Sequence, residues 1–362
     1  MVGVAVMMGL LAVIASQALG LPLRDPEGFL GPAWIRLPAL VIGAFLVDIV
    51  PRSLWRSRGR FSKFRDEARQ IVHEHWTKER VVLVVIGIAS FYMTYVGYRN
   101  LKNFLPFIRE GTQDPLLKSV DEALLFGHDP AILLHGVFGE GFSAHVLSFI
   151  YLAYLPLVPV SIVAWVVWSR NISYGYWFVT AQVLGWALGT ASYYAIPSLG
   201  PAFYYVWLYS DLENTGVTQL QNSLFYGRTD VMWDPFNTEG VQSVAGFASL
   251  HVAITLVVAL VAHYTVRHAW IRWSIWVFLV LTVIATIYFG WHYIADDIAG
   301  ALIAVVAVYI GGLATGQKFD RHGLASHPPT STADVPLHEE YVAAGASSGT
   351  SEGAAVGEGP AR

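Results

Sequence analysis

Two residues with complementary chemistry, His292 and Asp296, lie four positions apart in the segment Gly290-Trp-His-Tyr-Ile-Ala-Asp-Asp-Ile-Ala-Gly300. Positions i and i+4 share one face of an α-helix, so the Asp296 carboxylate can bind one imidazole nitrogen and orient the ring. The other nitrogen is then basic and can act as a nucleophile or a general base. The pair therefore indicates covalent or acid–base chemistry.

A second histidine follows a serine in the segment Phe247-Ala-Ser-Leu-His251. Ser249 lies near the expected start of an apolar helix, where its hydroxyl and the free backbone N–H groups favour an anion. His251 is placed to protonate a leaving oxygen. A single histidine on an apolar helix is more often a hydrogen-bonded packing residue, and it is the flanking motif that favours the catalytic interpretation.

Positive charge for the same site is offered by Arg99 and Lys102, which lie three residues apart. On a helix this spacing places both side chains on one face, where they can hold the non-bridging oxygens of a phosphate group. These residue types together fit a site for phosphate esters. The predicted catalytic residues are His292, His251 and Asp296, and the predicted phosphate-binding residues are Arg99, Lys102 and Ser249.

The elements that must position these residues are membrane helices. Of the 362 residues, 55% are hydrophobic and only 13% are charged, whereas soluble domains carry about 25% charged residues. Eight apolar runs are long enough to cross a hydrocarbon core, which takes roughly 20 residues. These runs are 3–20, 34–50, 81–98, 147–168, 176–195, 248–266, 273–290 and 298–314. We expect an all-α polytopic membrane helix bundle of about eight transmembrane helices, six of which form the catalytic core.

Three regions follow from this pattern. Residues 1–79 contain two N-terminal helices and a basic loop, residues 80–315 form the catalytic membrane domain, and residues 316–362 form a tail. The tail is rich in small and polar residues from about 323 onward, so we expect it to be disordered. The first run is read as an uncleaved helix because a basic start and a clear cleavage site are lacking; a signal peptide is the alternative.

Two further segments differ from simple spans. The stretch 128–145 is interrupted by glycines and predicts an interfacial or re-entrant helix. The long segment 196–246 combines acidic and aromatic residues, which suggests a folded cap over the site.

The distribution of Lys and Arg predicts the orientation, because these residues are enriched in cytoplasmic loops. The segment 51–80 holds nine of the 22 Lys and Arg residues. The connections 169–175 and 267–272 and the tail add six more, so this side has fifteen and the opposite side has seven. We therefore expect a multi-pass protein of the cell membrane with both termini in the cytoplasm. The predicted site residues then lie on the extracytoplasmic face.

The motifs resemble those of the type 2 phosphatidic acid phosphatase superfamily, and most closely its inositol phosphorylceramide synthase-like (inositolphosphotransferase) branch. Residues 247–251 are similar to that branch's Phe-Pro-Ser-Leu-His, with Ala248 in place of proline. Residues 292–300 are similar to its His-Tyr-x-x-Asp-x-x-Ala-Gly, and Ile-Pro-Ser-Leu-Gly-Pro at 196–201 resembles its Pro-Thr-Leu-Gly-Pro. The resemblance covers residues 80–315, approximately, and leaves out the first two helices and the tail.

The resemblance implies that His292 forms a phosphohistidine, that Asp296 supports it and that His251 protonates the leaving group. It implies no cofactor and no metal ion. The wider superfamily has an arginine six residues before the nucleophile, where this chain has Thr286. The synthase branch also tends to lack that arginine, so the departure favours the branch and leaves one phosphate ligand unassigned.

The first motif of the superfamily, a lysine followed seven residues later by Arg-Pro, is imperfect. Lys102 and Arg109 have the spacing, but Glu110 replaces the proline. Arg99 is the alternative arginine, and we favour it because it lies nearer the end of the membrane helix.

Several other residues have simpler interpretations. A metal site built on His251, His292 and Asp296 is geometrically possible, but the chemistry of the superfamily does not need one. Asp297 is read as a helix-terminal polar group that can also assist the site. Turn formation is expected for Pro197, Gly200 and Pro201, a solvated position for His73 and His75, and an interfacial one for His128, His135 and His145.

Composition also excludes some functions. The chain has no cysteine, which excludes disulfides and thiolate chemistry. A net charge of −4 gives no indication of nucleic-acid binding.

We therefore expect a membrane enzyme that acts on a lipid phosphate ester. With water as acceptor it is a phosphatase, and with the hydroxyl of inositol or another alcohol it is a transferase. The alternatives are a polyprenyl phosphate or diphosphate phosphatase, and a non-enzymatic phospholipid-binding or transport protein. Transporters often carry ionisable groups near mid-bilayer, and these spans have almost none there. The sequence leaves the lipid, the acceptor and the oligomeric state open.

Overall fold

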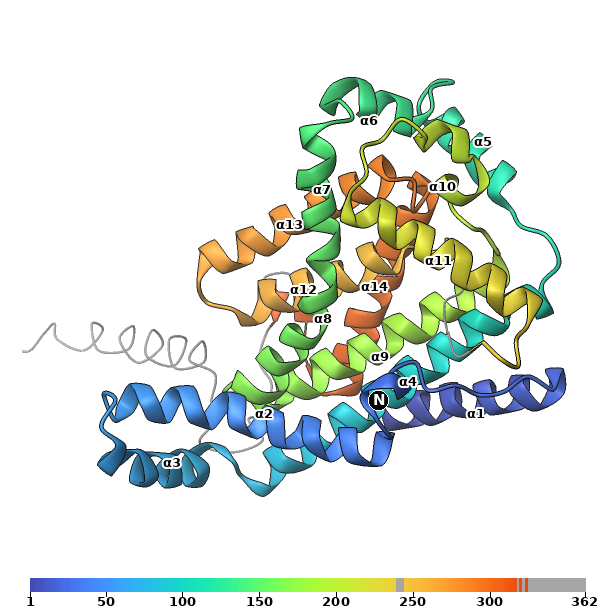
Figure 1. Cartoon of the computed structure of the whole chain (residues 1–362). Helices are drawn as coiled ribbons and strands as arrows, with labels where there is room; N and C mark the ends of the chain where they lie inside the picture. The colour runs from blue at the N-terminus through green and yellow to red at the C-terminus, as the bar shows by residue number, and fades with distance from the viewer. Residues whose placement is uncertain (239–243, 318, 321–322, 325–362) are drawn as a thin grey trace, which may run out of the picture.

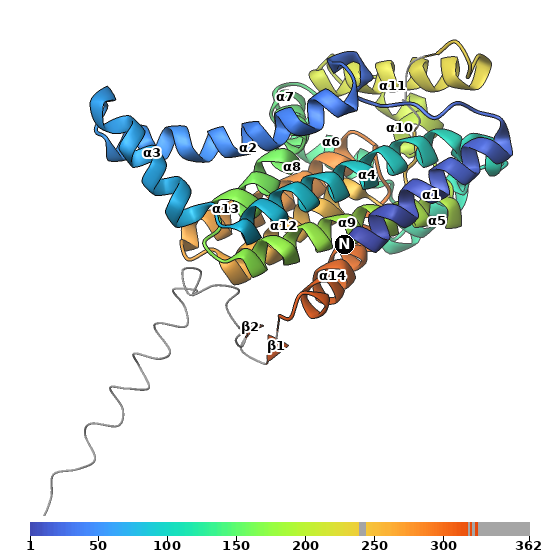
Figure 2. The same ribbon diagram turned by 90° about the horizontal axis from the view of Figure 1, so that it is seen from below.

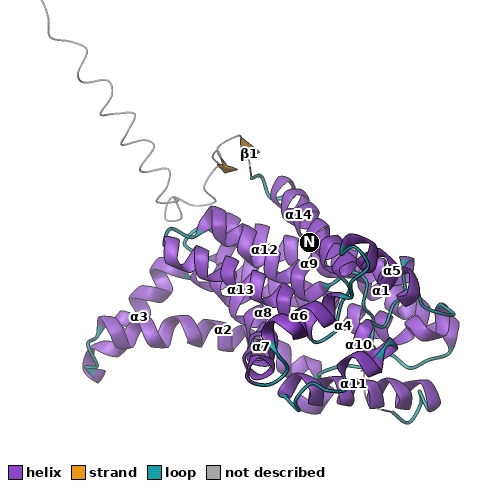
Figure 3. Cartoon of the chain, turned by 90° about the horizontal axis from the view of Figure 1, so that it is seen from above, coloured by secondary structure: helices purple, strands orange, loops and turns teal. Residues whose placement is uncertain are grey.

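The protein is a helical bundle in the computed structural model, which describes residues 1–238, 244–317, 319–320 and 323–324 (Figures 1 and 3). Six segments of this described part are long and apolar enough to cross a membrane. They are α1 (Val2–Leu19), α2 (Ala33–Arg56), α4 (Lys78–Ile108), the continuous segment Phe142–Trp168, α13 (Ala269–Tyr288) and α14 (Ile294–Ala314). The helices α9 (Ile172–Ala195) and α12 (Leu250–Thr265) account for the two remaining apolar runs, so the predicted fold class is confirmed.

Shorter elements connect these helices. The segment Phe142–Trp168 consists of α7 (Phe142–Leu152), α8 (Tyr154–Val163) and a π-helical turn, η2 (Ala164–Trp168). The remaining helices are α3 (Phe61–His75), α5 (Asp114–Leu124), α6 (Pro130–Phe138), α10 (Pro201–Tyr204) and α11 (Gly216–Trp233). Two 3₁₀ turns, η1 (Gly28–Leu30) and η3 (Val206–Tyr209), and a short antiparallel pair, β1 (Phe319–Asp320) and β2 (Gly323–Leu324), complete the described elements.

The centre of the bundle is α9, which packs against α4, α12 and α14 (Figure 1). It is buried around its circumference, as expected of a helix that is apolar on all sides. Small residues allow the close approach: a side chain at Gly189, for example, would collide with Leu250 of α12. By contrast, α2 and α3 project from the bundle (Figure 2).

The helices α12 and α14 approach each other closely next to the predicted site. A Cβ atom at Gly300 would meet the carbonyl oxygen of Ser249, so only glycine permits this packing. The Ser249 N–H donates a hydrogen bond to the Asp296 carbonyl at 3.0 Å. The two helices therefore begin side by side, and the two predicted catalytic histidines are brought to the same end of the bundle.

Three expectations about local structure require correction. The stretch 128–145 is not one interfacial helix: it forms α6 and the start of α7, so the fourth apolar segment begins at Phe142. The basic block is not a simple solvated loop, because it contains the end of α2 and the whole of α3. His75 of α3 is not solvated: its Nε2 lies 2.7 Å from the Val167 carbonyl, a partner at the end of the π-helical turn.

The predicted cap is present as α10, η3 and α11. The α11 helix is anchored on α7, where the Val217 N–H donates to Ser148 Oγ at 3.1 Å. Further along, Gln221 donates to the Phe289 carbonyl at 2.7 Å, just before the His292 loop. The tail was expected to span residues 316–362 and to be disordered from about residue 323. Within it the structure describes β1 and β2, and residues 325–362 lie outside the described residues.

We expect Gly300→Ala to lower the thermal unfolding midpoint of the purified protein, because the added methyl group must push α14 away from Ser249. Overpacking of this kind costs about 1–3 kcal/mol. The matched control is Gly43→Ala in α2, where no atom lies within 4 Å of the new Cβ. An unchanged midpoint for Gly300→Ala, with full activity, would show that the close contact is not required.

Candidate active site

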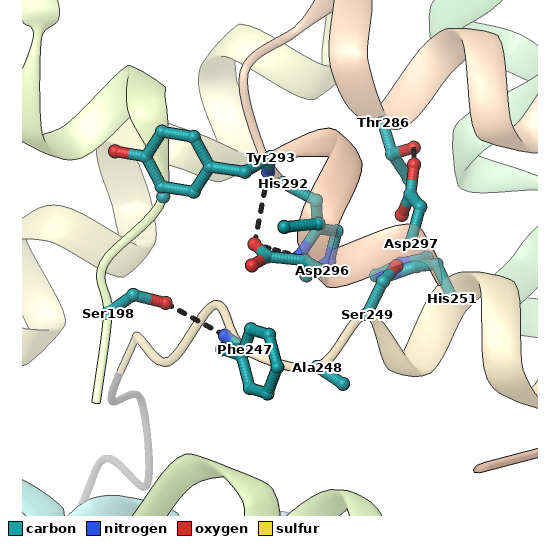
Figure 4. A network of polar contacts seen from close by, with 12 residues as sticks. Ser198, Phe247, Ala248, Ser249, His251, Thr286, His292, Tyr293, Asp296 and Asp297 are labelled. Atoms are coloured by element: carbon teal, nitrogen blue, oxygen red, sulfur yellow. Dashed lines mark hydrogen bonds and ion pairs between the residues drawn. The ribbon is translucent and has the colours of Figure 1, made fainter. Parts of the chain in front are cut away.

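His292 and Asp296 meet at the start of α14 (Figure 4). They do not share a helix face as expected, because His292 lies in the loop before α14 and only Asp296 lies on the helix. Nδ1 of His292 lies 3.4 Å from Oδ2 of Asp296, and the two side chains are 7% and 0% exposed. The same carboxylate oxygen accepts the Tyr293 N–H at 3.0 Å. Asp296 is therefore fixed by the backbone of its own helix turn and lies beside Nδ1 of the imidazole, so we expect Nε2 to be the reactive atom.

The environment of His292 keeps the ring neutral. Burial lowers the pKa of the imidazole to about 4; the nearby Lys102 ammonium acts in the same direction and Asp297 opposes it. At neutral pH the ring is therefore unprotonated, which is the state that can attack phosphorus.

A second carboxylate, Asp297, lies beside the pair and is also buried. Its Oδ2 accepts the Thr286 hydroxyl at 2.9 Å, and the Ser249 hydroxyl also bonds to this carboxylate. Thr286 occupies the position at which the superfamily resembled by the motifs has an arginine. The structure thus places a small hydroxyl and a carboxylate where a large cation would otherwise be expected.

His251 is held in a stack of aromatic rings. Tyr151 lies parallel to it with ring centroids 4.4 Å apart, and Tyr154 is tilted against it at 4.2 Å. Tyr151 in turn stacks on Trp291, with centroids 5.2 Å apart. The rings of His251 and His292 are 6.1 Å apart, so a single phosphate ester can contact both.

Lys102 is the cation that faces the two histidines. Its ammonium group is close enough to interact electrostatically with both His251 and His292. It lies 5.8 Å above the centres of the Tyr98 and Tyr193 rings, and its Nζ is 3.5 Å from the Tyr98 hydroxyl. The ammonium group is therefore held against two aromatic rings, near both histidines.

Arg99, which was expected to share a face with Lys102, contacts a different tyrosine. Its guanidinium lies 5.8 Å from the centre of the Tyr95 ring, and the Tyr95 hydroxyl donates to Glu27 at 2.9 Å. Arg109, the other candidate arginine, is exposed at the end of α4.

Ser249 begins α12 and is fully buried. Its hydroxyl accepts the Val252 N–H at 3.4 Å, as a helix N-cap does, besides its bond to Asp297. The loop in front of it is joined to the 196–201 segment: Phe247 N–H donates to Ser198 Oγ at 2.8 Å (Figure 4), and Gly246 N–H donates to the Ser198 carbonyl at 2.8 Å. The Phe247–Ala248 peptide bond, where the similar motif has proline, is cis.

The expected turn at 196–201 is present and touches the His292 loop. Gly200 has φ 94° and its α-carbon lies against the Trp291 carbonyl, where any side chain would collide. Ala202 N–H donates to the Gly290 carbonyl at 2.8 Å. The predicted motifs therefore form one connected surface around His292.

Histidines outside this surface serve other contacts. His135 lies 2.9 Å from the Tyr288 carbonyl, His145 pairs with Glu213 at 2.8 Å, and His128 is exposed. Within the residues that the structure describes, no group of three or more His, Cys, Asp or Glu side chains is arranged to hold a metal ion.

A family model described as the PAP2 superfamily matches residues 116–310, more than half of the chain. The chain belongs to the PAP2 superfamily. No curated protein and no solved structure matches it. PAP2 proteins are generally phosphatases that act on phosphoesters, so the membrane bundle and the family together support a membrane phosphatase-type function. The match includes His251, Ser249, His292 and Asp296 and begins after Arg99 and Lys102.

The sequence analysis did not identify the residues of the PAP2 site that are far from the motifs in sequence. Tyr151 and Tyr154 lie about 100 residues before His251, in what reads as an ordinary apolar run. The Thr286–Asp297 contact links two helices, and its only sequence signal was the missing arginine. These contacts depend on tertiary packing, which spacing along one helix does not encode.

Proposed function

We propose that this protein is a metal-independent membrane phosphatase or phosphotransferase that acts on a lipid phosphate ester through a phosphohistidine. The observation that carries the proposal is the arrangement of the two histidine rings, 6.1 Å apart, with Asp296 behind His292 and Lys102 facing both. A nucleophile, an acid and a cation therefore border one space. Family membership supports the same chemistry.

In the first step, Nε2 of His292 attacks phosphorus and the bond from phosphorus to the leaving oxygen breaks. His251, which must be protonated when the phosphate ester is bound, gives its proton to that oxygen, and Asp296 stabilises the positive charge that develops on His292. In the second step, neutral His251 takes a proton from the acceptor hydroxyl as its oxygen attacks phosphorus, and the bond to His292 breaks. Lys102 binds the non-bridging oxygens in both steps, with Arg99 and Ser249 as further proposed contributors.

The acceptor distinguishes the possible activities. The motifs resembling the inositolphosphotransferase branch favour transfer of an inositol-phosphate-type or other phospho-headgroup to an alcohol. A polyprenyl phosphate or diphosphate phosphatase fits the same site with water as acceptor. A purely lipid-binding or transport function would not need a neutral histidine oriented by a carboxylate, so we consider catalysis better supported.

The role of His292 is tested with a donor lipid labelled at phosphorus. His292→Ala should lower turnover by on the order of a thousandfold or more and should yield no acid-labile label on the protein. His251→Ala, the matched comparison, should still accumulate label, more slowly with a poor leaving group than with an activated aryl phosphate. Turnover of His292→Ala within about tenfold of wild type would contradict the nucleophile assignment.

We further propose that the site faces away from the cytoplasm of the cell and that both termini are cytoplasmic. The α4 helix carries Arg80 near one end and Lys102 near the other, about 33 Å apart at 1.5 Å per residue, which is close to the thickness of a hydrocarbon core. The basic α2–α3 region lies at the Arg80 end, and the positive-inside rule favours the cytoplasm for it.

The orientation is tested with single cysteines, which the native chain lacks. Gln219→Cys on α11 and Ser62→Cys on α3 both introduce an exposed thiol. A membrane-impermeant maleimide should label Gln219→Cys in intact cells and Ser62→Cys only after permeabilisation. The reverse pattern would place the active site on the cytoplasmic leaflet.

A further inference from the structure

The α14 helix is capped only in part by its own residues. Asp296 accepts the Tyr293 N–H at 3.0 Å, but the N–H groups of Ile294 and Ala295 also need partners. Asp121 of α5 provides them: its two carboxylate oxygens accept Ile294 N–H at 2.8 Å and Ala295 N–H at 3.2 Å. The start of the helix that carries Asp296 is therefore fixed by a residue from a different part of the chain.

A second buried carboxylate on the same helix, Asp114, holds the other side of the loop. It accepts Gly200 N–H at 2.9 Å and Leu199 N–H at 3.1 Å, both from the turn that contacts Trp291. It also accepts the Tyr293 hydroxyl at 3.0 Å. One side chain thus ties the 196–201 turn to the residue that follows His292.

Asp114 and Asp121 lie seven positions apart, two turns of α5, and therefore share one face. They are 0% and 1% exposed. Buried carboxylates are costly unless their oxygens are hydrogen-bonded, and apolar residues would pack such a helix at less cost. Their presence indicates that the hydrogen bonds to the His292 loop, rather than packing alone, are what this face of α5 provides.

We propose that Asp114 and Asp121 are positioning residues of the active site, which hold the residues that follow His292 and the 199–200 turn that packs against Trp291, so that the His292 ring stays aligned with Asp296 and with the phosphorus. This inference rests on the proposed function of His292. Neither carboxylate is assigned a contact with the substrate. Because phosphate binding is assigned to Lys102, loss of the hydrogen bonds of Asp114 and Asp121 should affect the chemical step more than substrate binding.

The test compares Asp121→Asn with Glu122→Gln in the full-length enzyme. Glu122 is adjacent to Asp121 on α5, but its side chain is 41% exposed. Its described ion pair is with Lys118, at 2.9 Å. We expect Asp121→Asn to lower kcat about 10- to 100-fold, the effect of a misplacement of about 1 Å, while KM changes less than about threefold. The rate of phosphohistidine formation should fall by the same factor as kcat, and Glu122→Gln should behave as wild type.

Two further variants separate positioning from loss of folding. Tyr293→Phe removes only the hydroxyl that Asp114 accepts, and it should lower kcat by a smaller factor without a change in KM. Asp121→Glu retains a carboxylate and should recover part of the loss in Asp121→Asn. Each preparation is first required to be monodisperse, with an unfolding midpoint near that of wild type; if Asp121→Asn fails this requirement, Tyr293→Phe decides alone.

The outcomes distinguish this inference from the proposed function. In one outcome, wild type forms an acid-labile label, His292→Ala does not, and Asp121→Asn and Tyr293→Phe both label at the wild-type rate. The positioning role of Asp114 and Asp121 is then refuted and the proposed function stands. A rise in KM with unchanged kcat in the folded variants also overturns positioning. If His292→Ala labels like wild type, the proposed function itself fails.

Discussion

The contact between α12 and α14 is the constraint on which the site depends. Gly300 allows the backbone of α14 to approach the Ser249 carbonyl, and the Ser249 N–H bonds to the Asp296 carbonyl at 3.0 Å. Because both helices begin at this contact, His251 and His292 lie at the same depth and on the same end of the bundle. Separation of the two helices would part His251 from His292, the proposed acid and nucleophile, even if both side chains remained present.

The charge balance around this contact differs from that of a site with the superfamily arginine. Thr286 replaces that cation and bonds to the buried Asp297, so the region behind His292 is acidic and hydroxyl-rich. The positive charge instead comes from across the site, where Lys102 lies over two tyrosine rings. A phosphate between the histidines would therefore be attracted toward α4 while the carboxylates stabilise the imidazolium. This separation of charges favours a transition state in which negative charge moves away from His292.

Much of this could be predicted from the sequence because the relevant spacing is local. The spacing of His292 and Asp296 paired the right residues although His292 is not on a helix: it precedes α14, and the loop at the start of that helix brings the two side chains together. The apolar runs predicted the fold class and the eight main helices. Long-range contacts were not predictable: Asp114 and Asp121 bond to backbone groups more than 80 residues away in sequence, and backbone partners leave no residue pattern. The spacing along α4 also did not predict that Arg99 contacts the Tyr95 ring. The contact of His75 with the Val167 carbonyl was also not predictable, because the π-helical turn that presents this carbonyl has no recognisable sequence pattern.

The central claim is that the phosphoryl group passes through His292, which requires two successive in-line displacements. Each displacement inverts the configuration at phosphorus, so the complete reaction retains it. The most direct measurement uses a donor lipid made chiral at phosphorus with isotopic oxygens or sulfur, with transfer to an added alcohol and stereochemical analysis of the product. The account predicts net retention. Net inversion would show that the acceptor displaces the leaving group directly, and would contradict a covalent role for His292.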